Sequence, residues 1–283
     1  MTSPGRLPTF IVVGAQKAGT SSLHAYLSRH PAVAVSRPKE THYFTDQVHR
    51  ARDRRWYVDQ FRGPVDAAAI GETSPSYTSY PSRLGVAQRI HEAVPDVRLV
   101  YLLRHPVDRA ISGYQLAVRH GWERRPLDAA LREDNRYLVQ SLYGAQIEEL
   151  LRWFPREALL TVLSTDLRDH RARTVDAVFA HVGVEALAAQ LDLDVEHNVT
   201  AGKRAPNGLA RLAHDPSRVL GAVGRLPRPM AAVTRRAVLR PLRERERVAS
   251  ADTLDLVRQR LRGDLERLAT FLGTPADPWG LLS

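Results

Sequence analysis

The sequence has no cysteine and only three lysines, so arginine makes up nearly all of its 41 basic side chains. Without cysteine the chain has no disulfide, no thiolate metal ligand and no thiol nucleophile, which favours a reducing compartment. Its N-terminal part also lacks an apolar run of the length needed to cross a bilayer, which is roughly 20 residues. The first apolar stretch covers only residues 10–13 and ends at a glycine. We therefore expect a cytoplasmic protein that is neither secreted nor membrane-spanning.

The rest of the composition is that of a folded protein. The 283 residues are 43% hydrophobic and 25% charged, which excludes disordered and fibrous classes and allows a buried core. We find no internal repeat and no convincing linker. We predict a single domain over residues 1–283, with a core at about 8–195, a basic segment at about 200–250 and a closing helix at about 251–272.

The formal charge of +10 is concentrated in one segment. Residues 201–250 carry 12 basic side chains against three acidic ones, and the remainder of the chain is close to neutral. Such a segment can be a solvated surface, or a lid or docking face for an anionic partner. It has no aromatic side chain to stack on bases, so we expect no nucleic-acid partner.

Short apolar runs rich in β-branched residues alternate with segments of helical period. This alternation predicts an α/β fold, with a parallel sheet flanked by helices on both faces. The expected strands are residues 10–13, 32–35, 67–70, 98–103 and 159–163, and the expected helices are 21–28, 81–94, 106–119, 140–153, 174–182 and 251–272.

A glycine-bounded loop follows the first expected strand, where ligands of open parallel sheets bind. It runs from Gly14 to Gly19 and leads into a helix opened by Thr20 and Ser21. The spacing is that of the nucleotide loop G-x-x-x-x-G-K-[ST], but Thr20 replaces the usual lysine and Lys17 lies inside the loop instead. We predict a phosphate or sulfate site in this P-loop-like turn; the alternative is an ordinary tight turn.

A second candidate for anion binding follows the fourth expected strand. Arg104 leaves that strand with a guanidinium that can hold a phosphate in two hydrogen bonds, and Ser112 lies within the helix that Pro106 begins. The alternative for Arg104 is an ion pair with a neighbouring carboxylate. Arg109, next to an aspartate, is expected to be structural.

These segments resemble the sulfotransferases that use 3′-phosphoadenosine 5′-phosphosulfate (PAPS), and among them bacterial members related to the heparan-sulfate-type branch. Residues 14–21 are similar to the family's 5′-phosphosulfate loop, and residues 104–114 to its 3′-phosphate motif R-x-P-x-x-R-x-x-S-x-Y. Residues 38–44, P-K-E-T-H-Y-F, resemble the segment that supplies a glutamate base followed two residues later by a histidine. The similarity runs from about residue 10 to residue 179.

The resemblance implies PAPS as the sulfuryl donor, bound without a metal. Arg104 and Ser112 would hold its 3′-phosphate, and Lys203 with Arg204 is the counterpart of a basic loop that closes on the nucleotide. The residues implied at its 5′ end are Lys17, Ala18, Gly19, Thr20 and Ser21.

The acceptor side of the expected reaction has three candidates. Glu40 would be the general base, and His42 would orient Glu40 or the acceptor hydroxyl, or act as the base itself. Lys17, on the donor side of the reaction, would neutralise the charge on the leaving phosphate. Glu72 either caps a helix or lines the acceptor pocket, and we favour the pocket. Thr73 stands where the heparan-type enzymes often have a second lysine, so the acceptor is left open among small molecules, glycolipids and carbohydrates, including anionic or membrane-surface ones.

Two other classes remain as alternatives. A P-loop kinase or NTPase would use a similar fold, but it should have lysine at position 20 and a carboxylate for magnesium. A nucleic-acid-binding protein would use residues 201–250, and salt-sensitive binding of DNA by that fragment would support it.

Overall fold

The computed structural model describes residues 5–64, 66–133, 136–194, 204–206 and 239–282. Its contacts divide the chain into two compact units, the first formed by Met1–Pro106, Val139–Asn198 and Arg262–Ser283 and the second by Val107–Leu138 and Val199–Leu261. Helices α5 (Pro106–His120) and α14 (Ala251–Leu272) each begin in one unit and end in the other. The prediction of a single domain therefore stays a prediction.

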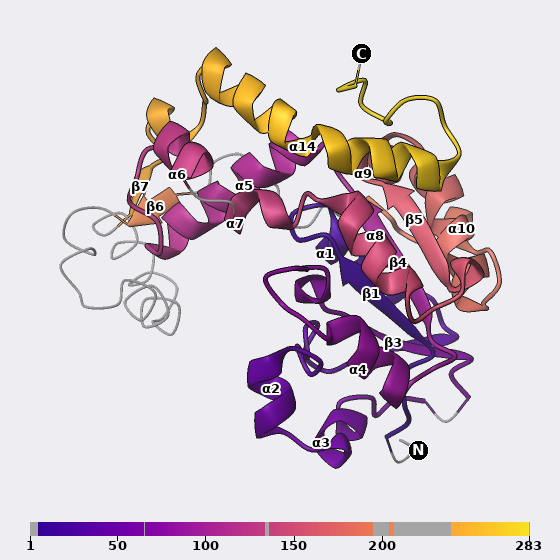
Figure 1. The fold of residues 1–283 in the computed structure, drawn as a ribbon. Helices are drawn as coiled ribbons and strands as arrows, with labels where there is room; N and C mark the ends of the chain where they lie inside the picture. The colour runs from indigo at the N-terminus through magenta and orange to yellow at the C-terminus, as the bar shows by residue number, and fades with distance from the viewer. Residues whose placement is uncertain (1–4, 65, 134–135, 195–203, 207–238, 283) are drawn as a thin grey trace. The chain divides into compact units, whose positions relative to one another are not determined.

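A five-stranded parallel sheet forms the centre of the first unit, in the order β2-β3-β1-β4-β5 (Figure 1). This sheet confirms the predicted fold class. Every residue of the central strand β1 is buried, as expected for the continuous apolar run with neighbours on both sides. The strands are β1 (Phe10–Gly14), β2 (Val33–Val35), β3 (Ala69–Thr73), β4 (Arg98–Leu103) and β5 (Leu159–Leu163).

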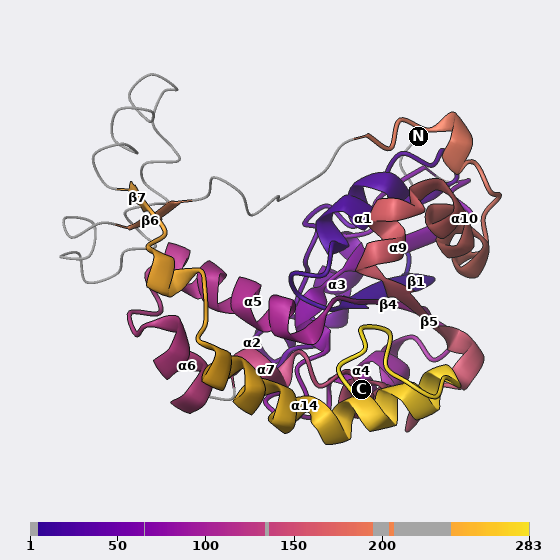
Figure 2. The ribbon, with the colours of Figure 1, turned by 90° about the horizontal axis from the view of Figure 1, so that it is seen from above.

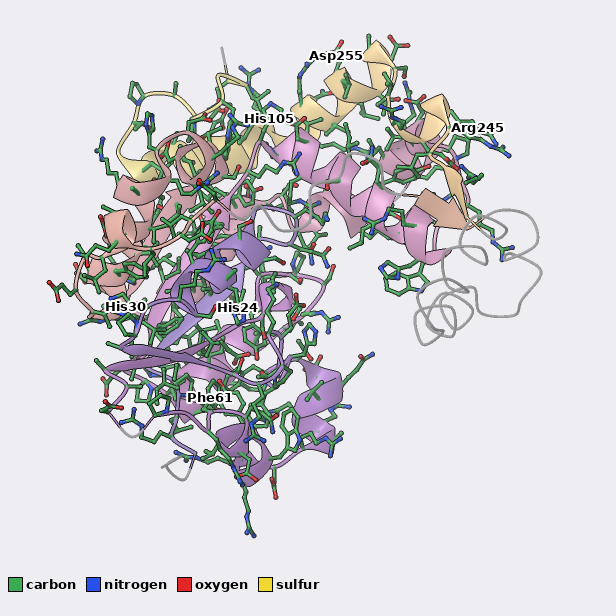
Figure 3. All side chains as sticks on the ribbon, turned by 180° about the vertical axis from the view of Figure 1, so that it is seen from behind. His24, His30, Phe61, His105, Arg245 and Asp255 are labelled. Carbon is green, nitrogen blue, oxygen red and sulfur yellow. The ribbon has the colours of Figure 1, made fainter. Side chains whose placement is uncertain are left out.

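Helices cover both faces of this sheet. Figure 2 shows α1 (Thr20–Leu27), α9 (Ser164–Asp169) and α10 (Arg171–Val182) on one side and α4 (Val86–Ala93) on the other. Helix α1 carries His24, which is labelled in Figure 3. This residue also ties the helix to the sheet, because its Nδ1 lies 3.1 Å from Thr73 Oγ1 of β3.

The closing helix α14 docks on the start of α8 (Tyr143–Leu151) within the first unit. The buried carboxylate of Asp264 accepts the amides of Gly144 and Ala145 at 2.9 and 2.8 Å. A Cβ on Gly144 would lie 2.6 Å from the Asp264 carbonyl oxygen, so the close approach of the two helices requires glycine there.

The third strand differs from its prediction, because it covers Ala69–Thr73 rather than residues 67–70. Glu72 pairs in register with Ile11 of β1, so it lies inside the sheet and not in the loop that follows. The apolar run ends at Ile70, and the polar residues beyond it remain in the strand because β1 continues beside them.

Several short elements were not predicted, because a segment of four to seven residues is too short to show a helical period. The additional helices are α2 (Asp46–Ala51), α3 (Arg54–Asp59), α6 (Leu127–Glu133), α7 (Arg136–Val139) and α9 (Ser164–Asp169), with 3₁₀ turns at Pro75–Tyr77, Arg156–Ala158, Ala188–Gln190 and Glu244–Glu246. No helix within the described ranges is both long enough and apolar enough to cross a membrane.

A buried carboxylate in the second unit, that of Glu123, joins several neighbouring groups through hydrogen bonds. Glu123 accepts the amides of Arg124 and Arg125, the Arg125 guanidinium and the Tyr137 hydroxyl. Burial opposes ionisation of Glu123, but these hydrogen bonds outweigh it and lower the pKa of the carboxyl to about 2. Arg109 is buried and donates to the Tyr137 carbonyl, so its predicted structural role agrees with its position.

The described ends of the basic segment form a short antiparallel ladder. Strand β6 (Arg204–Pro206) pairs with β7 (Leu239–Pro241). Arg240 holds Glu246 in a bidentate ion pair, with both side chains largely buried at 16% and 8% exposed. Part of the basic segment at about 200–250 is therefore regular structure.

Candidate functional site

The anion loop predicted after the first strand lies between β1 and α1. Gly19 precedes α1 with φ of 101°, and Lys17 also has a left-handed backbone with φ of 74°. The loop is anchored to the neighbouring strand by the Ala15 amide, which donates to the Leu102 carbonyl at 2.8 Å. The first turn of a helix carries amides without intrahelical acceptors and the positive end of the dipole, so this loop is suited to an anion.

Arg104 is joined to this loop. Its guanidinium donates to the Lys17 carbonyl at 3.0 Å, and Tyr143 holds its backbone on both sides, accepting from the Arg104 amide at 3.2 Å and donating to its carbonyl at 2.7 Å. Among the described residues no carboxylate lies within ion-pair distance of Arg104, so the alternative of a carboxylate partner has no support there. The exits of β1 and β4 thus bring Lys17 and Arg104 together.

Ser112 lies in α5, on the part that belongs to the second unit. Its side chain is 4% exposed, and its hydroxyl has no hydrogen-bond partner among the described residues. A buried hydroxyl in this state is available to a ligand. The pairing of Ser112 with Arg104 on one phosphate stays a prediction, because the two residues belong to different units.

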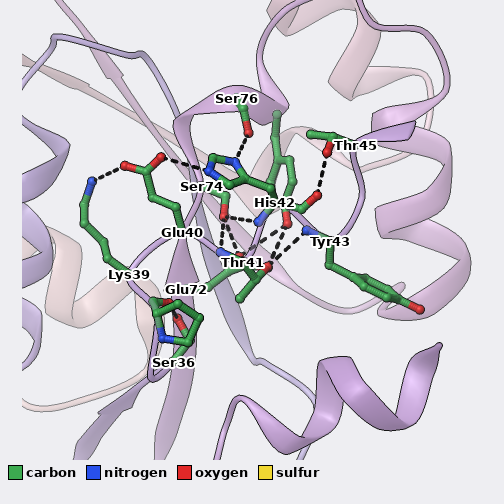
Figure 4. A network of polar contacts seen from close by, with 12 residues as sticks. Ser36, Lys39, Glu40, Thr41, His42, Tyr43, Thr45, Glu72, Ser74 and Ser76 are labelled. Atoms are coloured by element: carbon green, nitrogen blue, oxygen red, sulfur yellow. Dashed lines mark hydrogen bonds and ion pairs between the residues drawn. The ribbon is translucent and has the colours of Figure 1, made fainter. Parts of the chain in front are cut away.

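Glu40 and His42 are in contact. Glu40 Oε2 lies 3.4 Å from His42 Nε2, and Lys39 Nζ donates to Glu40 Oε1 at 2.8 Å (Figure 4). The side chains of Glu40 and His42 are 37% and 41% exposed, so both are accessible to an acceptor. His42 Nδ1 lies 2.7 Å from Ser76 Oγ, which fixes the imidazole from the opposite side. The spacing of two residues therefore places an accessible carboxylate and an accessible imidazole side by side.

The prediction that Glu72 lines the acceptor pocket is not supported by its position. Its side chain is 0% exposed, and its carboxylate accepts hydroxyl hydrogens from four neighbouring side chains. It does not cap a helix either, because it lies inside β3. The donors are Thr41 at 2.6 Å, Tyr57 at 2.6 Å, Ser74 at 2.6 Å and Tyr77 at 3.1 Å.

Burial is the main influence on the titration of this cluster. It raises the pKa of the Glu72 carboxyl, while the hydrogen bonds from the four hydroxyls act in the opposite direction. It also raises the pKa of Tyr57 and Tyr77 well above their usual range, and the nearby charge of Glu72 adds to this effect. The tyrosines therefore stay protonated and serve as donors.

Sequence reasoning did not identify Thr41, Ser74 or Ser76 as part of the site. The available signal was the density of hydroxyls in residues 73–78, T-S-P-S-Y-T, directly after an expected strand. Lys203 lies outside the described residues. Arg204 begins β6, and the role predicted for these two residues stays a prediction.

Comparison with known proteins identifies the family of this chain. The model of the sulfotransferase family matches residues 39–188, which is more than half of the chain. The chain belongs to the sulfotransferase family. It is 32% identical over 201 residues to human bifunctional heparan sulfate N-deacetylase/N-sulfotransferase 2, covering 63% of this chain and 22% of that protein. It is 30% identical over 227 residues to human heparan sulfate glucosamine 3-O-sulfotransferase 6, covering 73% of this chain and 62% of that protein.

The fold is also shared with a solved sulfotransferase. The structure of the sulfotransferase from Alicyclobacillus acidocaldarius matches 95% of this chain and 97% of its own, with a TM-score of 0.67 and 24% identity. The family match favours a sulfotransferase over the alternative of a P-loop kinase or NTPase, although the matched residues begin after the loop. The chain spans less than two thirds of the length of the curated relatives named above.

The left-handed backbone of Gly19 gives a test of the anion loop's geometry. Gly19→Ala should lower the free energy of unfolding by about 1 kcal/mol, because a Cβ is strained at a φ of 101°. Gly263→Ala is the matched control: no atom lies within 4 Å of its Cβ position in the interior of α14. That control should raise stability by up to about 1 kcal/mol. Urea denaturation measures both, and equal effects would contradict the loop geometry.

Proposed function

We propose that this protein transfers a sulfuryl group from PAPS to a hydroxyl or amine acceptor. The observation that carries the proposal is the combination, within one unit, of an anion loop joined to Arg104 and an accessible Glu40–His42 pair. The family match over residues 39–188 supports the reaction class. The two human relatives are named for transfer to a nitrogen and to an oxygen of heparan sulfate, respectively.

The donor is proposed to bind in the first unit through the loop and Arg104. Lys17 with the amides at the start of α1 suits the 5′-phosphosulfate, and the forked guanidinium of Arg104 suits a phosphate. Ser112, which the sequence motif assigns to the 3′-phosphate, lies in the second unit, and its role stays a prediction. The loop and Arg104 offer hydrogen-bond donors and positive charge, which is the chemistry that a polyanionic nucleotide requires.

The proposed transfer is an in-line displacement at sulfur. The acceptor oxygen or nitrogen forms the new bond to sulfur while the bond from sulfur to the phosphate oxygen breaks. Glu40 takes the acceptor proton, and His42 holds the Glu40 carboxylate from one side while Lys39 holds it from the other. Lys17 neutralises the charge that develops on the departing phosphate.

Donor binding is tested by calorimetry with the product nucleotide, 3′-phosphoadenosine 5′-phosphate. The wild type should bind it, and Lys17→Ala and Arg104→Ala should each weaken binding at least about 10-fold, because each removes a charge-assisted contact. Arg258→Ala, which changes an exposed arginine on α14, is the control and should bind normally. Absence of binding by the wild type would refute the proposed donor.

The base is tested separately from the donor site. Glu40→Gln should bind the nucleotide as the wild type does but lose at least about 10²-fold in turnover, since the amide cannot accept a proton. Glu266→Gln, on the exposed face of α14, should keep full turnover. Unchanged turnover of Glu40→Gln would assign the base to His42 or to another group.

Exposed arginines on and between α2 and α3, the helices that follow the Glu40–His42 pair in the chain, suggest an anionic acceptor. Tyr43 follows His42 directly, and its ring lies 6.3 Å from Trp56 of α3. Four arginines on and between α2 and α3 are exposed and make no ion pair with another described residue, and one of them lies 5.2 Å from the centroid of the Trp56 ring. Guanidinium groups bind carboxylate and sulfate groups bidentately. The four are Arg50, Arg52, Arg54 and Arg55.

Charge reversal tests this acceptor preference. The double variant Arg54→Glu and Arg55→Glu should raise the KM for heparan sulfate oligosaccharides at least about 10-fold at low salt, with nucleotide binding unchanged, because like charges then face each other. The charge-matched control replaces two exposed arginines of α14, Arg258 and Arg262, by glutamate in the same way. Equal KM values for the double variant and the control would show that these arginines do not contribute to acceptor binding. Transfer to neutral oligosaccharides alone would contradict the proposal of an anionic acceptor.

A further inference from the structure

Four consecutive backbone amides, those of residues 41–44, donate to side-chain hydroxyls. The segment lies outside the sheet, so its amides need acceptors other than a strand ladder. Every hydroxyl that accepts one of them also contacts the carboxylate of Glu72. The contacts are the amides of Thr41 and His42 on Ser74 Oγ at 3.1 and 3.3 Å, the Tyr43 amide on Thr41 Oγ1 at 3.2 Å and the Phe44 amide on Tyr77 Oη at 3.5 Å.

The hydrogen-bond capacity of Ser74 is used completely. A serine hydroxyl has one hydrogen to donate and two lone pairs to accept. Ser74 donates its hydrogen to Glu72 Oε2 at 2.6 Å, which leaves both lone pairs for the amides of Thr41 and His42. Without an acceptor at position 72, the hydroxyl hydrogen would turn elsewhere and compete with one of the two amides.

The backbone held in this way is the backbone that presents the Glu40–His42 pair. His42 has a left-handed φ of 53°, which is unfavourable for a residue with a side chain and needs support from its surroundings. The Ser74 contact to the His42 amide supplies part of that support. A change of the His42 backbone would move the imidazole away from Glu40 Oε2 and Ser76 Oγ.

We propose that Glu72 is a positioning residue for the Glu40–His42 pair: its buried carboxylate orients the hydroxyls of Thr41 and Ser74, and these hold the segment that carries the pair. The inference rests on the proposed function, in which this pair receives the acceptor proton. Glu72 itself is fully buried, so it is not accessible to the sulfuryl donor or to the molecule that accepts the sulfuryl group.

Glutamine is the sharpest replacement because it keeps the shape and removes half of the acceptors. Oε1 of Glu72 receives Tyr57 and Tyr77, while Oε2 receives Thr41 and Ser74, with the Tyr77 hydroxyl also 3.3 Å from Oε2. An amide has one oxygen and one nitrogen that only donates, so it can satisfy one of these two sides and not the other. At least one pair of hydroxyls must then reorient.

Amide hydrogen exchange followed by NMR tests the inference without any acceptor. In Glu72→Gln and in Ser74→Ala, the amides of Thr41 and His42 should exchange about 10- to 100-fold faster than in the wild type, while Val12 in β1 stays protected. Local exchange of this kind separates a positioning role from general destabilisation, which would also expose β1. Unchanged protection of Thr41 and His42 both in Glu72→Gln and in Glu72→Ala, which keeps neither oxygen, would overturn the inference.

Tyr57→Phe is the matched control within the same cluster. The variant removes one hydroxyl donor from Glu72 Oε1. Among the described residues the Tyr57 hydroxyl bonds to Glu72 alone, and no amide of residues 41–44 donates to it. The variant should lower the free energy of unfolding, because a buried carboxylate loses a donor, while the exchange at Thr41 and His42 stays as in the wild type. Equal acceleration of exchange in Tyr57→Phe and Glu72→Gln would mean that the cluster only stabilises the fold.

Turnover provides the second arm and separates this inference from the proposed function. With an acceptor in hand, Glu72→Gln should lose at least about 10-fold in kcat with unchanged binding of 3′-phosphoadenosine 5′-phosphate, and adding Ser74→Ala should cause little further loss, since both act on one contact chain. Full kcat in Glu72→Gln would refute the positioning role of Glu72 and leave the proposed function untouched. A wild type that binds no nucleotide would refute the proposed function, and the exchange experiment would still judge the Glu72 contacts.

Discussion

Parallel strands end at one edge of a sheet, and the proposed site in the first unit depends on this constraint. The loop after β1 holds Lys17, the exit of β4 holds Arg104, and the segment after β2 holds Glu40 and His42. Contacts between the exits make the edge a site: Arg104 donates to the Lys17 carbonyl, and the Thr73 amide of β3 donates to the Lys39 carbonyl at 3.1 Å. Each strand exit is thereby held by its neighbours in the sheet rather than by its own loop.

The chemistry of the site divides into charges that face outward and a charge that is buried. Glu40 and His42 are accessible and can exchange a proton with an acceptor. Glu72 is inaccessible, and burying its carboxylate carries a cost that hydroxyl donors reduce. The Glu72 carboxylate is a fixed acceptor, because the hydroxyls around it turn their hydrogens inward. Those of Thr41, Ser74 and Tyr77 also accept backbone amides of residues 41–44. This arrangement links the core of the sheet to the segment that carries the proposed base.

The core elements were predicted well because their pattern is local. β4 and β5 cover the expected residues 98–103 and 159–163, and α14 covers the expected residues 251–272. The short helices α2 and α3 were missed, since six residues give no period and aromatic packing of Tyr43 on Tyr57, with ring centroids 4.3 Å apart, holds α3 in place. The end of β3 was misplaced because the pairing of Glu72 with Ile11 decides it, and no residue near Glu72 in the sequence reports that pairing.

The sequence by itself determined the class of the fold, the anion loop with Lys17 and the two-residue spacing of Glu40 and His42. These features are local, and strand periodicity, glycine spacing and residue type are sufficient to indicate them. Tertiary structure alone decided that Arg104 reaches the Lys17 carbonyl, that Glu72 is buried and that Ser74 and Ser76 support the segment around His42. These contacts join residues more than 30 positions apart, and their geometry follows from the packing of strands against one another.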